Sequence, residues 1–353
     1  MEPRLWYGND FKDLLGLPDA PQAVFCHSWA LDGLKFVLNW SITKDIRLKK
    51  VALIYGGTGA EAKVSATTSE AFAQALIELG LQYVKVEANH DLAKRLTDEN
   101  PDVALLALHG KWGEDGTVQG VCEYLKIPYS GSGVLSSALC MDKAFCKMLF
   151  EKNNIPSAKY QVLDIHETPK NKFTLELSYP VVVKPSREGS SVGVSIVEND
   201  EELHVAIDTA EEYDHIVLIE KFIEGKEVTV PIMGERTLAS VEIAPKHGFY
   251  NYENKYTTGN TNYIIPANVE KKTLDRINEI ALKCSKLVRN RSYARVDFMV
   301  DRQGNPFVME VNTLPGCTPT SLVPKSAAKE GIAFKDFIKF LLDMATTDYA
   351  GLK

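Results

Sequence analysis

Residues 295–312 read R-V-D-F-M-V-D-R-Q-G-N-P-F-V-M-E-V-N and predict an antiparallel β-hairpin. Gln303-Gly304 suits a two-residue turn between two strands. Such a turn sets Asp297 opposite Glu310. Side chains two residues apart share one face of a strand. The hairpin is therefore expected to present a row of polar groups on one face, with cross-strand partners about 5 Å apart.

The same register sets Arg295 opposite Asn312, on the face that carries Asp297 and Glu310. Two facing carboxylates repel each other unless a cation or a proton lies between them. Two carboxylates and an amide oxygen suit Mg²⁺, which usually binds together with substrate phosphates. The alternative is that Arg295 only neutralises Asp297 on a solvated face. The apolar residues between these positions favour the metal site.

A second cluster, Y-P-V-V-V-K-P-S-R-E-G-S-S-V-G-V, covers residues 179–194. A buried strand, 181–184, ends in Lys184 and is followed by a loop rich in glycine and hydroxyl groups, then by a second strand, 192–197. Such a loop presents N–H and hydroxyl groups to phosphate oxygens, and the lysine adds a fixed positive charge. An ordinary hairpin is the alternative, and the P-loop pattern G-x-x-x-x-G-K-[ST] is absent from the chain.

A third cluster follows the apolar strand 216–220, where Glu220 and Glu227 lie seven residues apart. A strand edge that leaves its sheet can bind a purine through its backbone, and Glu227 could bind ribose hydroxyls. Taken alone, these residues are better explained as a solvated strand end.

From Lys50 onward, strands alternate with helices, which predicts a parallel sheet with its functional edge at the carboxyl ends of the strands. The expected strands are 51–55, 83–86 and 103–108. Thr67–Glu70 suggests a capping box that opens a helix, and Gly80 is expected to close it.

Gly57, Gly59 and Ala62 fit G-x-G-x-x-G/A directly after the first strand, and Glu87 stands near the end of the next. This pattern is typical of dinucleotide binding and supports an NAD-dependent oxidoreductase as a rival hypothesis. That hypothesis leaves the polar hairpin face and Lys184 without a role.

Composition excludes several classes of protein. The 353 residues carry 40 basic and 47 acidic side chains, a net charge of −7 that argues against a broad nucleic-acid surface. We expect no membrane span, no signal peptide and a cytoplasmic location. The cysteines are dispersed, so they are expected to be reduced and mostly buried. Residues 1–48 are an aromatic-rich extension that we expect to pack on the neighbouring domain, with a dimer contact or a regulatory arm as the alternative.

Several motifs together resemble the D-alanine–D-alanine ligases of the ATP-grasp superfamily, over about residues 50–353. The matching stretches are G-G-T-G-A-E (56–61), H-G-K-W-G-E-D-G-T-V-Q-G (109–120), Y-S-G-S-G (129–133), M-D-K (141–143), V-K-P-S-R-E-G-S-S-V-G (183–193), E-N-K-Y (253–256), A-R-V-D-F-M (294–299) and E-V-N-T-L-P-G-C-T-P-T-S-L-V-P (310–324). They stand in family order with family-like spacing, and the set is far more specific than any one motif.

The resemblance implies an α/β ATP-grasp fold of three domains, with ATP between the second and third. The expected limits are 49–141, 142–230 and 231–353, after the extension. It implies ATP-dependent formation of D-alanyl-D-alanine through a D-alanyl phosphate, for peptidoglycan precursor synthesis. It also implies two Mg²⁺ ions, with Mn²⁺ as an alternative, a homodimer, and no nucleic-acid or membrane partner.

The resemblance also implies roles for particular residues. The ATP contacts are Lys143, Lys184, Ser191, Glu220, Phe222, Ile223, Glu227 and Lys255. The metal ligands are Asp297, Glu310 and Asn312, in agreement with the hairpin argument. The catalytic set is Glu61, Ser190, Tyr256, Arg295 and Gly316, and the substrate contacts are His109, Ser321 and Leu322.

Tyr256 bears on the choice of acceptor, because a tyrosine there resembles the dipeptide-forming ligases. D-lactate and D-serine are the alternative acceptors. Family members often carry other residues where Gly59, Ala62 and Lys63 stand, so this part of the first D-alanine site departs from the family pattern.

Overall fold

The structure is a computed structural model that describes residues 50–57, 62–246 and 260–350, without the side chains of Ala62 and Lys63. The chain divides into two units, Met1–Arg47 and Leu48–Lys353, and the described residues belong to the second. The extension, the Gly59 part of the glycine fingerprint and the 253–256 motif lie outside the described residues. Among the described helices, none has the length and apolar character needed to cross a bilayer.

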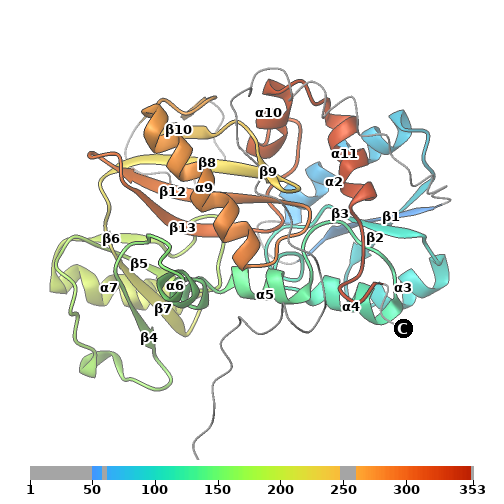
Figure 1. Ribbon diagram of the computed structural model, residues 1–353. Helices are drawn as coiled ribbons and strands as arrows, with labels where there is room; N and C mark the ends of the chain where they lie inside the picture. Colours follow the sequence, from blue (N-terminus) through green and yellow to red (C-terminus); the bar gives the residue numbers. More distant parts are fainter. Residues whose placement is uncertain (1–49, 58–61, 247–259, 351–353) are drawn as a thin grey trace, which may run out of the picture. The chain divides into compact units, whose positions relative to one another are not determined.

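The first sheet is parallel, as predicted, with strand order β2-β1-β3 (Figure 1). The strands are β1 (Val51–Gly56), β2 (Tyr83–Ala88) and β3 (Val103–Leu106), and the helices that follow them are α2 (Ala62–Glu78), α3 (Leu92–Glu99) and α4 (Thr117–Leu125). Strand β1 pairs with both other strands, so β2 lies on one side of it and β3 on the other, and the two connections run in opposite directions across the sheet. A crevice is expected beyond the carboxyl ends of β1 and β3, where ligands bind in such sheets.

The predicted start of α2 is wrong, and its predicted end is correct. The helix begins at Ala62, upstream of the proposed capping box. Thr67 therefore lies inside the helix, and the neighbouring hydroxyls of Ser65 and Thr68 donate to Ala107 O and Val64 O. Gly80 ends the helix with φ of +68°, and its N–H donates to Ile77 O while Leu81 N–H donates to Leu76 O, a Schellman motif.

The second sheet is antiparallel with strand order β4-β7-β5-β6. Its strands are β4 (Tyr160–Asp164), β5 (Val181–Pro185), β6 (Ser195–Val197) and β7 (Ile216–Lys221). Helix α7 (Asp200–Glu211) packs on it, while α5 (Val134–Met141) and α6 (Lys143–Lys152) lead into it, and η1 (Lys170–Lys172) lies between β4 and β5. The strand predicted from Val192 begins only at Ser195, because Val192 N–H turns back to Gly189 O.

The third sheet runs β11-β10-β8-β12-β13, with β9 beside β8. Its strands are β8 (Gly225–Met233), β9 (Arg236–Thr237), β10 (Val241–Pro245), β11 (Thr261–Ile264), β12 (Tyr293–Asp301) and β13 (Pro306–Asn312). Helix α9 (Lys271–Leu287) covers one face, where Ile277 and Ala281 share a core with Val230 and Val296 (Figure 1). The opposite face is left for polar side chains.

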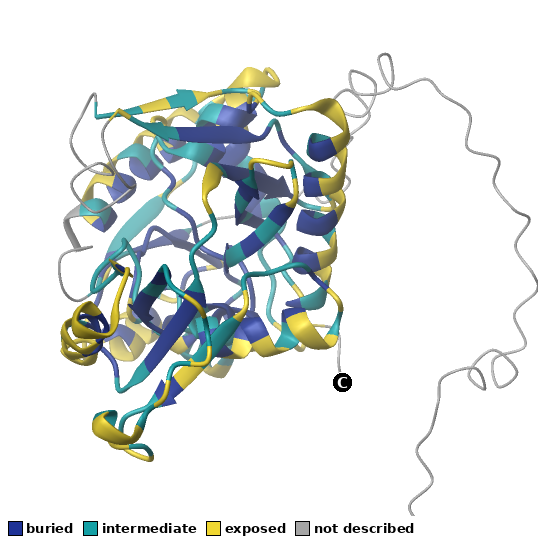
Figure 2. Ribbon diagram, turned by 90° about the vertical axis from the view of Figure 1, so that its left-hand side faces the viewer, coloured by how far each residue is buried: buried dark blue, intermediate teal, exposed yellow. Residues whose placement is uncertain are grey.

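The last two helices, α10 (Leu322–Lys329) and α11 (Phe334–Asp343), return to the first sheet. Phe337 and Leu341 lie in the same buried cluster as Leu53 and Ile54. Figure 2 shows the strands mainly buried and the outer faces of the helices mainly exposed. The final helices therefore join the first sheet to the segment that follows the polar hairpin.

Candidate active site

One cavity of about 1070 Å³ is lined by residues of the second and third sheets, by their connecting loops, and by α2 and the loop that follows β3. Every predicted site residue that lies within the described part of the chain lines it: His109, Lys143, Lys184, Ser190, Ser191, Glu220, Phe222, Ile223, Glu227, Arg295, Asp297, Glu310, Asn312, Gly316, Ser321 and Leu322. Glu61, Lys255 and Tyr256 lie outside the described residues. The cavity is large enough for a nucleotide and a small second substrate.

The polar hairpin has the predicted register at the site, although its turn differs from the prediction. Asp297 pairs with Glu310, and Arg295 pairs with Asn312. The loop, however, has three residues, 302–304, with Gly304 at φ of +81°. A β-bulge after Asp297 offsets the register by one residue, so Val308 and Val311 both face the core. The bulge therefore restores the pairing that a two-residue turn would have produced.

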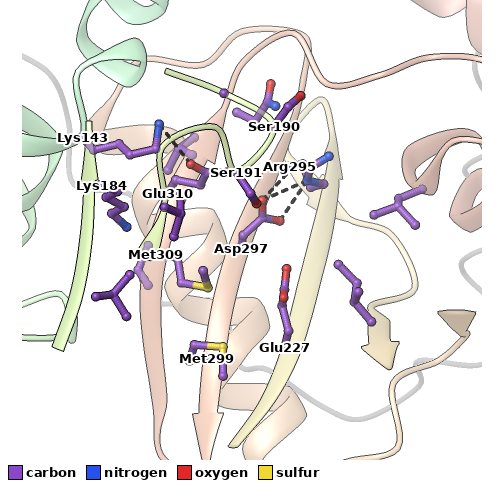
Figure 3. Close-up of a pocket in the computed structure, with 18 of the residues that line it drawn as sticks. Lys143, Lys184, Ser190, Ser191, Glu227, Arg295, Asp297, Met299, Met309 and Glu310 are labelled. Carbon is purple, nitrogen blue, oxygen red and sulfur yellow. Dashed lines mark hydrogen bonds and ion pairs between the residues drawn. The ribbon is translucent and has the colours of Figure 1, made fainter. Parts of the chain in front are cut away.

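The polar face extends onto the neighbouring strand β8. Asp297 lies opposite Thr229, and Met299 lies opposite Glu227. Figure 3 shows Glu227 on this strand and Arg295 against Asp297. The Thr229 hydroxyl donates to Asp297 Oδ1, a contact that was not predicted from the sequence. This contact could be found only by knowing that β8 pairs with β12, and no local sequence pattern indicates that pairing.

The two facing carboxylates, Asp297 and Glu310, each have a cationic partner. Arg295 donates to Asp297 through Nε (2.9 and 3.1 Å) and Nη2 (2.9 Å), and Lys143 Nζ lies 3.4 Å from Glu310 Oε2. Asp297 is only 4% exposed, so the face is not solvated as the alternative hypothesis required. Asn312 Oδ1 accepts from Leu314 N–H and keeps a second lone pair. The set of hard oxygen donors fits Mg²⁺.

A buried cluster of two lysines and one glutamate lies at the junction of α6, β5 and β7. Glu220 Oε1 contacts Lys147 Nζ, and Glu220 Oε2 contacts Lys184 Nζ. Burial alone would raise the pKa of the Glu220 carboxyl, but the two ammonium groups outweigh it and lower that pKa to about 2. Lys147 was missed by the sequence analysis, although its place one helical turn after Lys143 sets both on one face of α6.

The loop after β5 crosses the cavity and is held at several points. Lys143 Nζ donates to Glu188 O (2.5 Å), and Lys111 Nζ lies 2.6 Å from Glu188 Oε1. Ser190 and Ser191 have φ of +53° and +59°, a left-handed conformation that costs free energy for residues other than glycine. This strain at two hydroxyl residues in a cavity wall is typical of a ligand-binding loop.

His109 lies beyond the carboxyl end of β3 and is buried. Burial lowers the pKa of its imidazole to about 4, so the ring is neutral at pH 7. The Thr68 hydroxyl donates to Val64 O (3.0 Å) and lies 2.9 Å from His109 Nε2. Since its single proton is used, we assign the Nε2–H of His109 as the donor to Thr68. Nδ1 lies 3.9 Å from Glu114 Oε1, and neither Thr68 nor Glu114 was predicted.

His109 is also close to the segment before α10. A Cβ placed on Gly316 would lie 3.5 Å from Ser321 Oγ and 4.0 Å from His109 Cε1. Ser321 Oγ accepts from Thr318 N–H (3.0 Å), and Leu322 is the first residue of α10. The N-terminus of a helix favours an anionic group, which a substrate carboxylate would supply.

The far end of the cavity lies where β7 passes into β8. Phe222 N–H donates to Pro180 O (3.1 Å). The backbone hydrogen bonds predicted between this strand edge and a purine would therefore have to use backbone groups other than the Phe222 N–H. Ile223 lines the cavity beside it, and Glu227 stands on β8. An apolar edge next to a carboxylate suits a base and its ribose.

A second group of ligating side chains lies outside the cavity, formed by Asp164, His166 and His215. The two imidazole rings stack in parallel, with centroids 4.4 Å apart and planes at 6°. Arg187 Nη2 lies 3.2 Å from His215 Nδ1. The nitrogen lone pairs of two stacked parallel rings lie in separate planes and do not converge on one point. The guanidinium of Arg187 already lies beside one ring nitrogen, His215 Nδ1. This arrangement does not suit a shared metal ion.

Comparisons with family models and with known proteins all identify the same family. Residues 81–132 match the model "D-ala D-ala ligase N-terminus", and residues 149–343 match "D-ala D-ala ligase C-terminus". A D-alanine–D-alanine ligase of Citrifermentans bemidjiense is 43% identical over 86% of this chain and 98% of its own. One of Pelotomaculum thermopropionicum is 41% identical over 84% and 96%.

Solved structures give the same result. The crystal structure of the Bacillus anthracis D-alanine–D-alanine ligase is similar with a TM-score of 0.76, at 38% identity over 84% of this chain and 97% of that chain. The same enzyme complexed with ATP is similar with a TM-score of 0.73, at 35% identity over the same shares of the two chains.

Proposed function

The chain belongs to the D-alanine–D-alanine ligase family, and from this premise we propose that its 1070 Å³ cavity is the site where two D-alanines and ATP react. The chain is an ATP-dependent ligase that makes D-alanyl-D-alanine for peptidoglycan synthesis. The observation that carries the site proposal is that every described residue of the predicted set lines this one cavity. We also retain 49–141, 142–230 and 231–353 as the domain limits.

ATP is assigned to the part of the cavity between the second and third sheets. Phe222, Ile223 and Glu227 would bind the base and ribose, with Glu220 beside them. Lys143 and Lys184 would supply positive charge to the phosphates. Such charge lowers the barrier to phosphoryl transfer mainly by neutralising oxygens and holding them in line.

Asp297, Glu310 and Asn312 would hold two Mg²⁺ ions, or Mn²⁺ in their place. When bound, the metal neutralises phosphate oxygens. Arg295 and Lys143 add positive charge beside the two carboxylates.

The first D-alanine must be activated, because a carboxylate is a poor acyl donor. Its carboxylate oxygen attacks the γ-phosphorus, the bond from that phosphorus to the ADP oxygen breaks, and an acyl phosphate forms. We assign Glu61 to the ammonium of this substrate, with the neutral His109 ring beside it. The position of His109 beyond β3 supports this assignment.

The second D-alanine then attacks the acyl carbon with its amine, and phosphate leaves as the amine loses a proton. Ser321 and Leu322 would bind its carboxylate at the start of α10. Arg295 and the Gly316 N–H would stabilise the oxyanion, and one such donor is worth roughly 10²–10³ in rate. Asp297 orients the Arg295 guanidinium in the cavity wall by accepting from its Nε and Nη2.

The acyl phosphate would hydrolyse in open water, so the site must exclude solvent. The loop carrying Ser190 and Ser191 supports this role, because Lys111 and Lys143 tie its Glu188 across the cavity. Tyr256 is proposed as the lid residue that closes toward Ser190 and Glu61.

We further propose a cytoplasmic homodimer. The described cysteines are free and buried, as expected in a reducing compartment. Large apolar side chains are exposed on three successive helices: Tyr124 on α4, Leu135 on α5, and Phe145 and Met148 on α6. Exposed apolar surface of this kind often marks an interface. Sedimentation equilibrium of the full chain tests it, and a monomer at micromolar concentration would contradict it.

The test of function is release of ADP with Mg-ATP and D-alanine, with L-alanine, D-serine and D-lactate as parallel acceptors. Turnover that requires D-alanine and yields the dipeptide is expected, and Glu61→Gln should then abolish it. Preference for D-lactate or D-serine would replace the acceptor assignment. The oxidoreductase alternative is not favoured, because the family matches cover both ends of the cavity.

A further inference from the structure

Lys147 is a buried lysine that the reaction described above does not use. Its side chain is 1% exposed, and a lysine is almost never this buried unless it is paired. Its ammonium contacts Glu220 Oε1 and donates to Val308 O at 3.2 Å. Glu220 is on the second sheet and Val308 is on the third. Lys147 therefore joins the two sheets between which ATP is assigned.

The charges of this cluster do not cancel. Glu220 contacts one lysine with each oxygen, so the group of Lys147, Glu220 and Lys184 has a formal charge of +1; burial lowers the pKa of the Lys147 ammonium, and the Glu220 carboxylate opposes that shift. Both lysines line the cavity, but Lys184 is 10% exposed whereas Lys147 is 1% exposed and directs its ammonium to Glu220 and Val308 O. Without Lys147, Glu220 and Lys184 would form a neutral pair. The net positive charge at this part of the cavity thus depends on Lys147 as well as on the more exposed Lys184.

The backbone contact of Lys147 also lies at a sensitive point. Val308 immediately precedes the bulge that sets Glu310 opposite Asp297. Its N–H donates to Pro156 O (2.8 Å), and its carbonyl accepts from Lys147. The residue before the bulge is therefore held through its N–H by the segment that enters β4, and through its carbonyl by a side chain of α6.

We propose that Lys147 is a positioning residue that compensates Glu220 and so leaves Lys184 with uncancelled positive charge for the nucleotide phosphates. This rests on the proposed assignment of Lys184 to ATP. The interaction acts through charge in a water-poor site, where it is much less screened than at the surface. Its effect should therefore fall on ligands that carry phosphates.

The test compares ATP and adenosine as ligands of the full chain, by calorimetry and by competition. Lys147→Met keeps the length of the side chain and removes its charge. We expect the Kd for ATP to rise roughly 10- to 100-fold, while the Kd for adenosine changes less than about threefold. A purely structural role would weaken both ligands alike, and that result, or no change for ATP, would overturn the proposal.

The double variant Lys147→Met, Glu220→Gln supplies a second measurement, because it removes both charges of the buried pair and avoids an uncompensated acid. If Lys147 acts through Glu220, the double variant should bind ATP at least as tightly as Lys147→Met. Losses that multiply would contradict the proposal. Lys147→Arg keeps the charge and should retain ATP affinity within about tenfold.

The proposed function is tested separately by turnover of the unaltered chain with D-alanine. Failure of that turnover with normal ATP binding would reject the acceptor assignment and leave the Lys147 proposal standing. Normal turnover with equal losses for ATP and adenosine would reject the Lys147 proposal alone.

Discussion

Lowering the pH should destabilise this protein through His109. The imidazole is buried with a pKa of about 4, whereas an unfolded histidine titrates near 6.5. Between these values the unfolded chain binds a proton that the folded chain rejects, so the free energy of unfolding falls as pH falls. The contribution is fully present above about pH 7 and is lost progressively below pH 6.5.

The size of the effect follows from the two pKa values. Between pH 7.5 and pH 5.0 the loss is about 2 kcal/mol, and it approaches roughly 3 kcal/mol near pH 4. The cause is the burial of the ring, since its carboxylate neighbour Glu114 is 3.9 Å away and Gly110 N–H already donates to that carboxylate.

The assay is urea unfolding at pH 7.5 and pH 5.0, with His109→Gln as the matched control. Glutamine has no proton to gain, and its amide can still donate to Thr68. Other groups titrate in both proteins, so the difference between them isolates His109. The stability gap between the two proteins should shift by about 2 kcal/mol in favour of the variant at pH 5.0. An equal gap at both pH values would refute the reasoning.

Three further outcomes are expected. Glu310→Gln removes a proposed metal ligand, so D-alanine-dependent ADP release should need at least about tenfold more Mg²⁺, which a Mg²⁺ titration checks. Glu188→Gln breaks the ion pair with Lys111, which is half exposed, so kcat should change less than about threefold in steady-state assays; a larger loss would mean that this ion pair is essential for turnover. Gly225→Ala sets a Cβ 1.9 Å from Val300 O and should cost about 2–3 kcal/mol in urea unfolding, whereas Gly120→Ala, a helical position with open space, should be neutral or slightly stabilising.

The hairpin shows how far local pattern can reach. The pairing of Asp297 with Glu310 was predicted correctly, but from a two-residue turn that the chain does not make. Alternation of polar and apolar residues was the stronger signal, because the valines had to face the core under α9. The bulge at Met309 reconciles that requirement with a three-residue loop, and its position depends on packing that no short stretch specifies.

Helix α2 shows the opposite case. Thr67–Glu70 has the spacing of a capping box, yet the helix passes through it. The Thr68 hydroxyl faces inward to His109, forty-one residues away. This tertiary contact beside the predicted cap residue belongs to a helix interior, and it depends on where the sheet places His109.

The family and the polar residues assigned to the site could be predicted from the sequence alone, because those residues lie in short motifs whose chemistry requires adjacent positions. The fold alone brings Lys147 to Glu220, Thr229 to Asp297 and Thr68 to His109. Each of these pairs joins residues far apart in the chain. The physical reason is that a buried charge or polar group must be satisfied by whatever the fold brings within about 3 Å, and local sequence carries no record of that distance.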